Sequence, residues 1–539
     1  MFNAKALRVL ACLTLALTPI ASHAEEERQS LEELRNTVIN LLQALVDQGV
    51  ITKEKAQQMV AAAKQKAESD QTAVAKSDQV EEGAVRVPYV PQIVKDEIAK
   101  QVAQDVKPAV VADVVKEAKE EKWGVPGALA DWLTRTRLYG DLTLREEGIF
   151  YNGANAPEYN YYAINQAGGI TQAGENAFLD TTENRIRFRG RARIGLETTL
   201  SDSITAGVRL ATGNTSDLVS ETQTLDGTAP YAIGLDELYV RLDERTDQRF
   251  PWLTVVGGRF LNPYETPSNL IFHQDLSFTG MAATGRFGFG DGSADQSNVF
   301  MTVGAHQLQE IELSAQDKWL VAAELGTKIH FDDVNTLRVS GAFYDFFNVT
   351  GRLNPADQPG IYNYTAPQFL RFGNTLFNIA NTPNDTTQLY ALASKFRLAN
   401  LNATYTYAVG KYTLGLTADA VRNFGFKEAA VQANTGYYVK PYTKGYQTEA
   451  SFGYPVVETP GAWRVLVGYR YVGNDAVIDG YTDSDFHYFG GTNARGYYVA
   501  GTYGLANRVW VRLRYMSANE IDGPTFDVDT LQLDLSTRF

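Results

Sequence analysis

From Trp132 to the carboxy terminus, apolar and polar residues alternate with a period of two, which is the period of a β-strand. The clearest stretch is residues 184–197, where arginine occupies every second position and small or apolar residues fill the positions between. Its arginines are Arg185, Arg187, Arg189, Arg191 and Arg193. On a helix these side chains would scatter around the axis, whereas on a strand they share one face. The pattern predicts a strand with one strongly basic face and one apolar face.

Two environments suit such a strand. In a soluble protein, the basic face would be solvated and the apolar face would meet a core. In a transmembrane barrel, the apolar face meets lipid and the basic face meets a water-filled lumen. Five stacked guanidinium groups repel one another, so they need an anion, a carboxylate wall or deep hydration nearby. A barrel provides lipid for the apolar face and a hydrated lumen for the arginines, so we expect a transmembrane barrel here.

The same alternation predicts about sixteen antiparallel strands between residues 131 and 539, an even number that suits a transmembrane barrel. We place them at Leu138–Glu147, residues 184–197, Ser203–Gly213, Ile233–Asp243, Trp252–Phe260, Thr279–Phe289, Asn298–Gln307, Trp319–His330, Thr336–Phe347, Leu389–Tyr407, Lys411–Phe424, Gly445–Tyr454, Ala462–Val472, Gly496–Tyr503, Arg508–Ser517 and Val528–Phe539. Short turns and long polar loops alternate between them, which is typical of outer-membrane barrels with their turns on the periplasmic side.

The direction of each face follows from the cost of charge in lipid, about 2–4 kcal/mol for an arginine at the bilayer midplane. On the last strand, Leu531, Leu533 and Leu535 alternate with Gln532 and Asp534. The apolar set must therefore face lipid and the polar set the lumen. The basic residues that this reasoning places in the lumen, besides the five arginines, are Arg145, Arg209, Arg241, Arg338, Lys395, Arg397, Arg470 and Arg512. The acidic residues so placed are Asp141, Glu197, Glu237, Asp243 and Glu449.

The chain before the barrel has a different character. Residues 1–24 have a positive start, a short apolar run and a small-x-Ala cleavage site, which together predict a secretory signal peptide. Cys12 is the only cysteine, so a mature chain that begins after Ala24 has no disulfide; a lipoprotein reading with Cys12 lipidated is the weaker alternative. Residues 25–130 have helical spacing with a polar linker and predict a periplasmic helical segment, in which a helical hairpin and a coiled-coil seam are both open.

Composition supports a secreted barrel. The chain has 29 Tyr, 26 Phe and 45 Gly, and no apolar run after the signal is long enough for a membrane helix. The formal charge of −14 becomes −16 when Lys5 and Arg8 leave with the signal, which argues against nucleic acid as a partner. We expect no metal and no cofactor, because no metal-ligand spacing is present.

The loop between the fifth and sixth strands carries a resemblance to a known family. Residues 257–287 read GGRFLNPYETPSNLIFHQDLSFTGMAATGRF, and they contain a Gly-Arg-Phe-x-Asn-Pro-aromatic stretch followed by Asp-Leu-x-Phe-x-Gly. This stretch resembles the "putative porin" family of Gram-negative outer-membrane barrels. The helical segment LVDQGVITKEKAQQMV is similar to amino-terminal segments of such porins. The terminal Phe539 resembles the signal that the outer-membrane barrel assembly machinery reads.

The resemblance implies a porin that assembles as a homotrimer in outer-membrane lipid. It also implies that this third long loop folds inward and narrows the channel. Glu265, His273 and Asp275 would then lie at the constriction, and the two carboxylates would face the arginines across it. We expect a channel for passive diffusion of small hydrophilic solutes and ions, with a preference for anions. The arginines could instead do no more than pair with neighbouring lumen carboxylates, which is the simpler interpretation.

Three other functions stay open at this point. A channel specific for one oxyanion such as phosphate would saturate the arginines with that anion. A non-conducting structural or adhesive barrel would have a plugged lumen. An outer-membrane enzyme would need a nucleophile, a base and an orienting group. We expect no enzyme, because the four histidines beyond the signal stand in no catalytic motif; they are His273, His306, His330 and His487.

Overall fold

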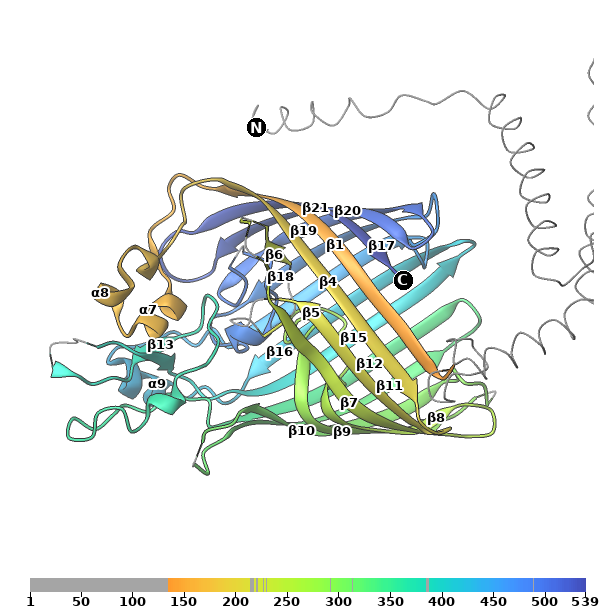
Figure 1. Cartoon of the computed structure of the whole chain (residues 1–539), viewed down its shortest axis with the longest axis horizontal. Coiled ribbons are helices and arrows are strands. Elements are labelled where there is room, and N and C mark those ends of the chain that lie inside the picture. The colour runs from red at the N-terminus through yellow and green to blue at the C-terminus, as the bar shows by residue number, and fades with distance from the viewer. Residues whose placement is uncertain are drawn as a thin grey trace, which may run out of the picture. The chain divides into compact units, whose positions relative to one another are not determined.

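The computed structural model describes residues 134–539, apart from 214–217, 220, 221, 226, 229, 291, 313, 384–386 and 488. The predicted signal peptide and helical segment lie outside the described residues. The described chain is all-β and forms one closed antiparallel barrel of 16 strands (Figure 1). These strands are β1 (Thr136–Tyr151), β4 (Arg185–Thr199), β5 (Ile204–Thr212), β7 (Ile233–Arg245), β8 (Pro251–Leu261), β9 (Ser277–Gly288), β10 (Asn298–Gln309), β11 (Lys318–His330), β12 (Asn335–Phe347), β15 (Arg397–Val409), β16 (Tyr412–Asn423), β17 (Lys444–Gly453), β18 (Trp463–Val472), β19 (Ala494–Ala506), β20 (Val509–Glu520) and β21 (Asp527–Arg538).

Each of these strands pairs with its neighbours along the chain, and the barrel closes where β1 pairs with β21. At this closing seam Arg145 lies in register with Asp534 of β21 on one side and Arg189 of β4 on the other. A closed sheet has no exposed edge, so every strand can satisfy its backbone hydrogen bonds within the membrane. Short accessory strands lie in the connections: β2 (Glu158–Tyr159), β3 (Phe178–Leu179), β6 (Gln223–Thr224), β13 (Leu376–Asn378) and β14 (Tyr390–Leu392).

All sixteen strands lie where the alternation predicts them, with one correction. The single strand predicted at Leu389–Tyr407 is wrong in its first half: the structure has β14 inside a loop and starts β15 only at Arg397. Residues 391–394 are buried consecutively rather than alternately, because this segment packs within the loop and pairs with β13. Consecutive burial resembles a strand in the sequence but lacks the two-sided character of a lipid-facing one.

The outer surface of the barrel is apolar. Phe287, Ile186 and Leu513 expose 74%, 62% and 50% of their surface, whereas their sequence neighbours on the other face are polar. In water such a continuous apolar surface would be unfavourable, but lipid accommodates it. The prediction that the apolar residues of the last strands face outward is confirmed by Leu513 and Leu535 outside and by Gln532 and Asp534 inside.

Long and short connections lie at opposite ends of the barrel. The long loops carry the helices α7 (Tyr161–Ala167), α8 (Ile170–Ala173) and α9 (Glu428–Thr435), which gather at one end in Figure 1. At the other end, the connections are as short as the turn between β15 and β16. Among the described residues, no helix has the length and apolar character needed to cross a membrane.

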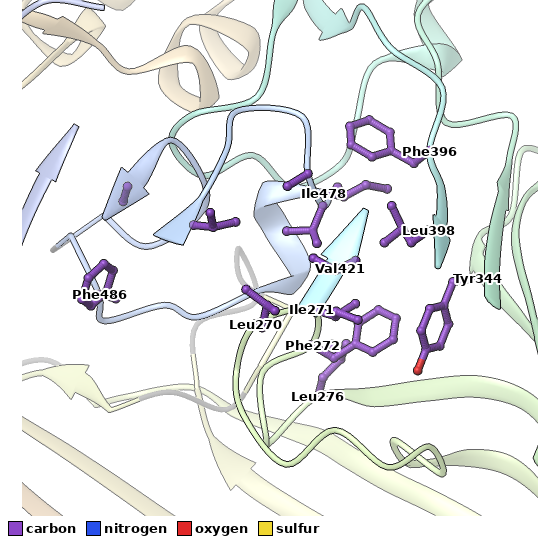
Figure 2. Close-up of a cluster of buried hydrophobic side chains, with 14 of the residues drawn as sticks. Leu270, Ile271, Phe272, Leu276, Tyr344, Phe396, Leu398, Val421, Ile478 and Phe486 are labelled. Atoms are coloured by element: carbon purple, nitrogen blue, oxygen red, sulfur yellow. The ribbon is translucent and has the colours of Figure 1, made fainter. Parts of the chain in front are cut away.

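A hydrophobic core lies inside the barrel, where a simple open pore would hold water. It joins inward-facing strand residues such as Tyr344 and Leu398 to two loops, residues 262–276 after β8 and residues 473–493 after β18 (Figure 2). The first, which we call the strap loop, contributes the fully buried Leu270, Ile271 and Phe272. The second, which we call the inner loop, contributes residues including Val477, Ile478 and Phe486. The loops are thus held by apolar burial.

Candidate pore and its charged wall

Four neighbouring strands, β20, β21, β1 and β4, present most of the charge in the lumen, and we call them the charged wall. Their register aligns side chains in rows across the sheet. One row contains Arg512, Asp534, Arg145 and Arg189, one from each strand. The next row contains Arg514, Gln532, Glu147 and Arg187, and the row on the other side contains Trp510, Ser536, Thr143 and Arg191. Directly opposed side chains on one face lie close enough to interact, so the rows mix both signs of charge.

The five arginines of β4 share the inner face, as the period of two predicts, and carboxylates meet them there. Arg187 and Arg189 both reach Glu147, at 2.5 and 3.2 Å. Arg191 and Arg193 both reach Asp141, at 3.4 and 2.8 Å. Arg185, at the loop end of the strand, is exposed. A wall that combines paired guanidinium and carboxylate groups carries much less net charge than the arginines alone imply.

The strap loop reaches this wall at its carboxyl end. Asp275 accepts hydrogen bonds from Arg191 at 2.6 Å and from Arg193 at 2.7 Å. Burial disfavours its charged form, but the two guanidinium groups outweigh burial and hold the pKa of Asp275 below its usual range. His273 lies two residues earlier, and its Nδ1 accepts a hydrogen bond from the backbone N–H of Asp275 at 3.1 Å. The expectation that Asp275 faces the arginines therefore matches the geometry, in direct contact rather than across a gap.

Glu265 lies elsewhere, which corrects the expectation that it also faces the arginines of β4. Its carboxylate pairs with Arg338 of β12, on the opposite side of the barrel. Its backbone N–H donates to both carboxylate oxygens of Glu324 at 3.1 Å, and its carbonyl accepts from Asn402 at 2.9 Å. The loop starts at β8 and crosses the lumen, so its two ends meet different walls. The sequence of the loop does not show which wall each of its ends contacts.

The tip of the strap loop is fixed by buried polar groups. The Ser268 hydroxyl donates to Asp419 of β16 at 2.6 Å. Arg470 of β18, only 1% exposed, donates to the carbonyl of Asn269 at 3.0 Å and to Thr482 of the inner loop at 2.6 Å. Arg470 was predicted to face the lumen, and it does, but it joins two loops instead of contacting solvent. Removing a hydrogen-bonded buried charge of this kind leaves several polar groups unsatisfied.

The inner loop supplies charges that the sequence did not point to. Asp485 pairs with Arg145 at 2.8 Å and lies 3.7 Å from both Arg189 and Arg514. Burial opposes its ionisation, yet Arg145, Arg189 and Arg514 lower the pKa of Asp485 well below its ordinary value. Asp-rich loops are common on surfaces, so the run Asp479–Asp485 gave no signal of its own. Only the fold places these carboxylates against the charged wall.

Two further carboxyl groups of the inner loop, Asp475 and Asp479, are almost fully buried. Burial raises the pKa of Asp479 to about 7 and that of Asp475 to about 6. Asp479 accepts backbone hydrogen bonds from Gly480 at 2.7 Å and Arg371 at 3.2 Å. Asp475 accepts from the Thr375 hydroxyl at 2.6 Å. Both carboxyl groups hold the loop between β12 and β15 against the inner loop.

Two of the cavities among the described residues border the strap loop, one near each of its ends. The first has a volume of about 300 Å³ and lies against the charged wall, with Arg193, Arg512 and Asp275 among its lining residues. The second has a volume of about 200 Å³ and is lined by Glu265 and Arg338 among others. The carboxyl end of the strap loop borders the first cavity and its amino end borders the second. The loop thus divides the polar space of the barrel.

The remaining basic residues assigned to the lumen divide into two groups. Arg209 pairs with Asp236 and Glu237 at 2.8 and 2.5 Å, and Arg241 with Asp243 at 2.7 Å, all on the inner face. Arg397 was placed wrongly: Leu398 and Asn400 face inward, so Arg397 lies on the outer face at the loop end of β15. Lys395 precedes β15 in the loop and is exposed. Both errors follow from reading residues 389–407 as one strand.

The acidic residues assigned to the lumen also have partners there. Glu197 accepts a hydrogen bond from Tyr239 at 2.9 Å, and Glu449 accepts one from Tyr498 at 2.5 Å. Phe539 is exposed and exchanges two backbone hydrogen bonds with Gly140, at 3.2 and 3.0 Å, beside the closing seam. Within the described part of the chain, no group of three or more His, Cys, Asp or Glu side chains is arranged to hold a metal ion.

A closed barrel that is apolar outside, polar inside and crossed by its third long loop has the architecture of an outer-membrane porin. Sequence comparison supports this class directly, because the profile of the family described as "Putative porin" matches residues 35–539. The chain belongs to this family, which places it in the outer membrane. Comparison with curated protein sequences gives no match.

Solved structures of outer-membrane proteins resemble the chain at a distance. OprB of Pseudomonas putida is 11% identical with a TM-score of 0.44, and the match covers 78% of this chain and 97% of that one. OmpF of Salmonella typhi in complex with daunomycin is 13% identical with a TM-score of 0.40, covering 75% and 97%. The outer-membrane channel DcaP of Acinetobacter baumannii is 9% identical with a TM-score of 0.38, covering 75% and 97%.

Proposed function

We propose that the protein is a passive channel for small hydrophilic solutes, with a preference for anions. The observation that carries this proposal is the polar cavity of about 300 Å³ between the strap loop and the charged wall, which is lined by five arginines and four aspartates. They are Arg145, Arg191, Arg193, Arg512 and Arg538, and Asp141, Asp275, Asp485 and Asp534. Charged groups on low-dielectric walls concentrate counter-ions, so a small excess of arginines over aspartates in the cavity lining favours anions.

A channel specific for one oxyanion is the second candidate. It is favoured by the two loops that fold into the barrel, because cavities of about 300 and 200 Å³ lined by arginines lie beside the strap loop. Guanidinium groups match oxyanions in geometry as well as in charge. A non-conducting barrel is less favoured, because the cavity walls are polar and water-compatible. We propose no enzymatic activity, cofactor or resident metal, in keeping with the membership of a porin family.

Assembly and domain organisation are part of the same proposal. We propose a homotrimer in the outer membrane, a terminal Phe539 that the barrel assembly machinery reads, and a barrel domain that occupies residues 131–539. The proposed signal peptide (1–24) and periplasmic helical segment (25–130) lie before it. The exposed position of Phe539 beside the closing seam supports a role in recognition, because an assembly factor could reach the side chain.

The test is reconstitution of the purified protein into a planar bilayer under a salt gradient, with conductance and reversal potential as the readouts. We expect steady conductance with a reversal potential that indicates anion preference. A triple variant, Arg187→Ser with Arg189→Ser and Arg191→Ser, should shift toward cations, because Glu147 loses both of its arginine partners and Asp275 and Asp485 lose one each. Absence of conductance in well-folded protein would sink the channel proposal.

A matched control removes three arginines that do not face the lumen. Arg397, Arg422 and Arg495 lie on the outward parity of their strands and are exposed. Replacing all three by Ser changes the net charge by the same amount as the first variant. The control should retain the wild-type reversal potential, since charges outside the lumen are screened within about one Debye length, roughly 8 Å at physiological salt. A shift equal to that of the first variant would show that selectivity reflects total charge and not the wall.

A further inference from the structure

The first cavity contains one guanidinium group that has no carboxylate partner. Arg191 and Arg193 share Asp141 and Asp275, Arg145 pairs with Asp485 and Asp534, and Arg538 pairs with Glu458. The exception is Arg512 of β20, which forms no ion pair and no side-chain hydrogen bond with any residue that the structure describes. A partly buried guanidinium group without protein partners needs another source of hydrogen-bond acceptors.

The register explains why Arg512 is left unpaired. Its cross-strand neighbour is Asp534, but Asp534 points its carboxylate toward Arg145 on the other side, accepting two hydrogen bonds at 2.6 and 3.1 Å. Asp485 of the inner loop also commits its nearest oxygen to Arg145, at 2.8 Å. Arg512 therefore experiences both carboxylates only at longer range. Arg512 is one of the residues that line the first cavity.

Neutral donors surround the same space. Ser536 and Thr143 lie in the adjacent row and share a hydrogen bond of 3.2 Å in which either hydroxyl could be the donor, so one hydroxyl hydrogen is left over. The Nδ1 atom of His273 accepts from the Asp275 backbone, so a neutral imidazole carries its proton on Nε2 and can donate from there. Hydroxyl and imidazole donors add hydrogen bonds to an anion without adding charge.

We propose that this cavity holds a binding site for a small oxyanion, phosphate or carboxylate in type, centred on Arg512. The guanidinium fork offers two parallel N–H groups to two oxygens of one anion, which a chloride ion cannot use. The paired arginines of β4 form its positive rim, and Arg512 makes the direct contact. This inference rests on the proposed channel function and adds a direct anion contact on β20 to the charge that β4 contributes.

The experiment compares the wild type with Arg512→Gln and with Arg464→Gln as the matched control. Arg464 lies on the inward parity of β18 and donates to the backbone carbonyls of Tyr454 and Pro455, which do not line the cavity. Like Arg512, it forms no ion pair with a carboxylate of the described residues. Both variants lose one positive charge. The first readout is the thermal unfolding midpoint of the full-length protein in detergent, in phosphate, acetate or chloride at equal ionic strength. The second is the anion-to-cation permeability ratio in bilayers.

We expect phosphate or acetate to raise the unfolding midpoint of the wild type and of Arg464→Gln above the value in chloride, because a ligand that binds only the folded state stabilises it. This increase should vanish in Arg512→Gln, and its permeability ratio should fall severalfold. A larger effect of phosphate than of acetate identifies a tetrahedral oxyanion, and the reverse identifies a carboxylate. An equal response of Arg512→Gln and the wild type in both readouts would overturn the proposal.

The two readouts separate this inference from the channel proposal. If phosphate or acetate raises the unfolding midpoint of the wild type but not of Arg512→Gln, and the protein does not conduct, the binding site is supported and the channel proposal is contradicted. If the protein conducts and neither readout changes in Arg512→Gln, the channel proposal is supported and the binding site is contradicted. Should Arg512→Gln fail to fold, Arg512→Lys is the test variant. It keeps the charge but loses the fork, so its oxyanion shift should be clearly smaller than that of the wild type, and an unchanged shift would contradict the proposal.

Discussion

Two opposite parts of the barrel wall differ in the side chains that they direct into the lumen. The charged wall of β20, β21, β1 and β4 keeps its side chains in rows of paired charges and faces a polar cavity. On the other side, strands β11, β12, β15 and β16 direct Leu320, Tyr344, Leu398 and Val421 inward, where they pack against the strap and inner loops. The outward-facing side chains are apolar on both walls. The two walls differ in their inward-facing side chains, which are charged on one wall and largely apolar on the other.

The difference shows what fixes the loops and what is left for solutes. Apolar burial contributes about 25 cal/mol per Å² and has no direction, so the apolar wall can hold the loops without specifying their charge. The charged wall contributes direction and sign through ion pairs, and it retains the space that a solute needs. The strap loop joins the two: its Phe272 packs on the apolar wall and its Asp275 meets the charged one.

The largest effect should come from breaking the apolar side. Phe272 is fully buried, with ring centroids 5.1 Å from Phe278 and from Tyr344. Changing Phe272 to Ala should cost the loop packing about 3–5 kcal/mol. We expect higher single-channel conductance and faster proteolysis within residues 262–276. The matched control is Phe287→Ala, which removes the same side chain from the outer surface, where it is 74% exposed. Equal behaviour of the two variants would show that the inner core does not hold the loop.

A smaller effect should follow from pH, at the contact between the inner loop and the loop after β12. Burial raises the pKa of Asp479 to about 7, above its unfolded value of 3.8. The folded state therefore holds the proton more tightly, so loop packing is most stable below pH 4 and loses stability as pH rises toward 7. The full change is on the order of 4 kcal/mol at 1.36 kcal/mol per pKa unit. Asp475, with a pKa of about 6, acts in the same direction.

The measurement is amide hydrogen exchange of residues 473–493 at several pH values, corrected for the intrinsic pH dependence of exchange. Asp479→Asn should flatten the change between pH 4 and pH 7, leaving the part due to Asp475. Asp483 and Asp485 have lowered pKa values, because nearby arginines outweigh burial, so their contribution disappears only below pH 4. Protection that increases from pH 4 to pH 7 in the wild type would contradict the prediction.

The smallest effect should come from the charged side and should be visible in selectivity alone. Asp275→Asn removes one negative charge from the first cavity while Arg191 and Arg193 keep Asp141 as a partner. We expect a stronger anion preference in the reversal potential and little change in folding, since the loop tip remains anchored by Arg470. Glu265→Gln is the comparison for the second cavity, beside Arg338. A shift of Asp275→Asn toward cations would contradict the assigned sign.

The fold was predictable because each strand carries its own evidence. In β4 and β21, the period of two and the high cost of charge in lipid specify both the strand and its outward face without knowledge of any neighbour. The inward third loop came from a family resemblance, and the contact of Asp275 with the arginines followed from it. The error at Leu389–Tyr407 arose where consecutive burial within a loop replaces alternation.

The candidate site was predictable only in part, because it depends on register and on loop path. That Arg512 lacks a partner follows from the orientation of Asp534 toward Arg145, and these residues lie on three different strands. Neither the contact of Asp485 with the charged wall nor the pairing of Glu265 with Arg338 can be predicted from the local sequence. Contacts between residues hundreds of positions apart are set by the closed barrel as a whole.

The closing seam has a consequence for how the protein is made. Arg145 and Asp534 are 389 residues apart in sequence, yet they form the ion pair that leaves Arg512 unpaired. This contact can form only when β1 pairs with β21. Contacts between residues so far apart in sequence slow folding, and the edges of the unclosed sheet stay exposed until the barrel closes. The proposed oxyanion site is therefore absent from every partly assembled form of the chain. Anion binding would report that the barrel has closed.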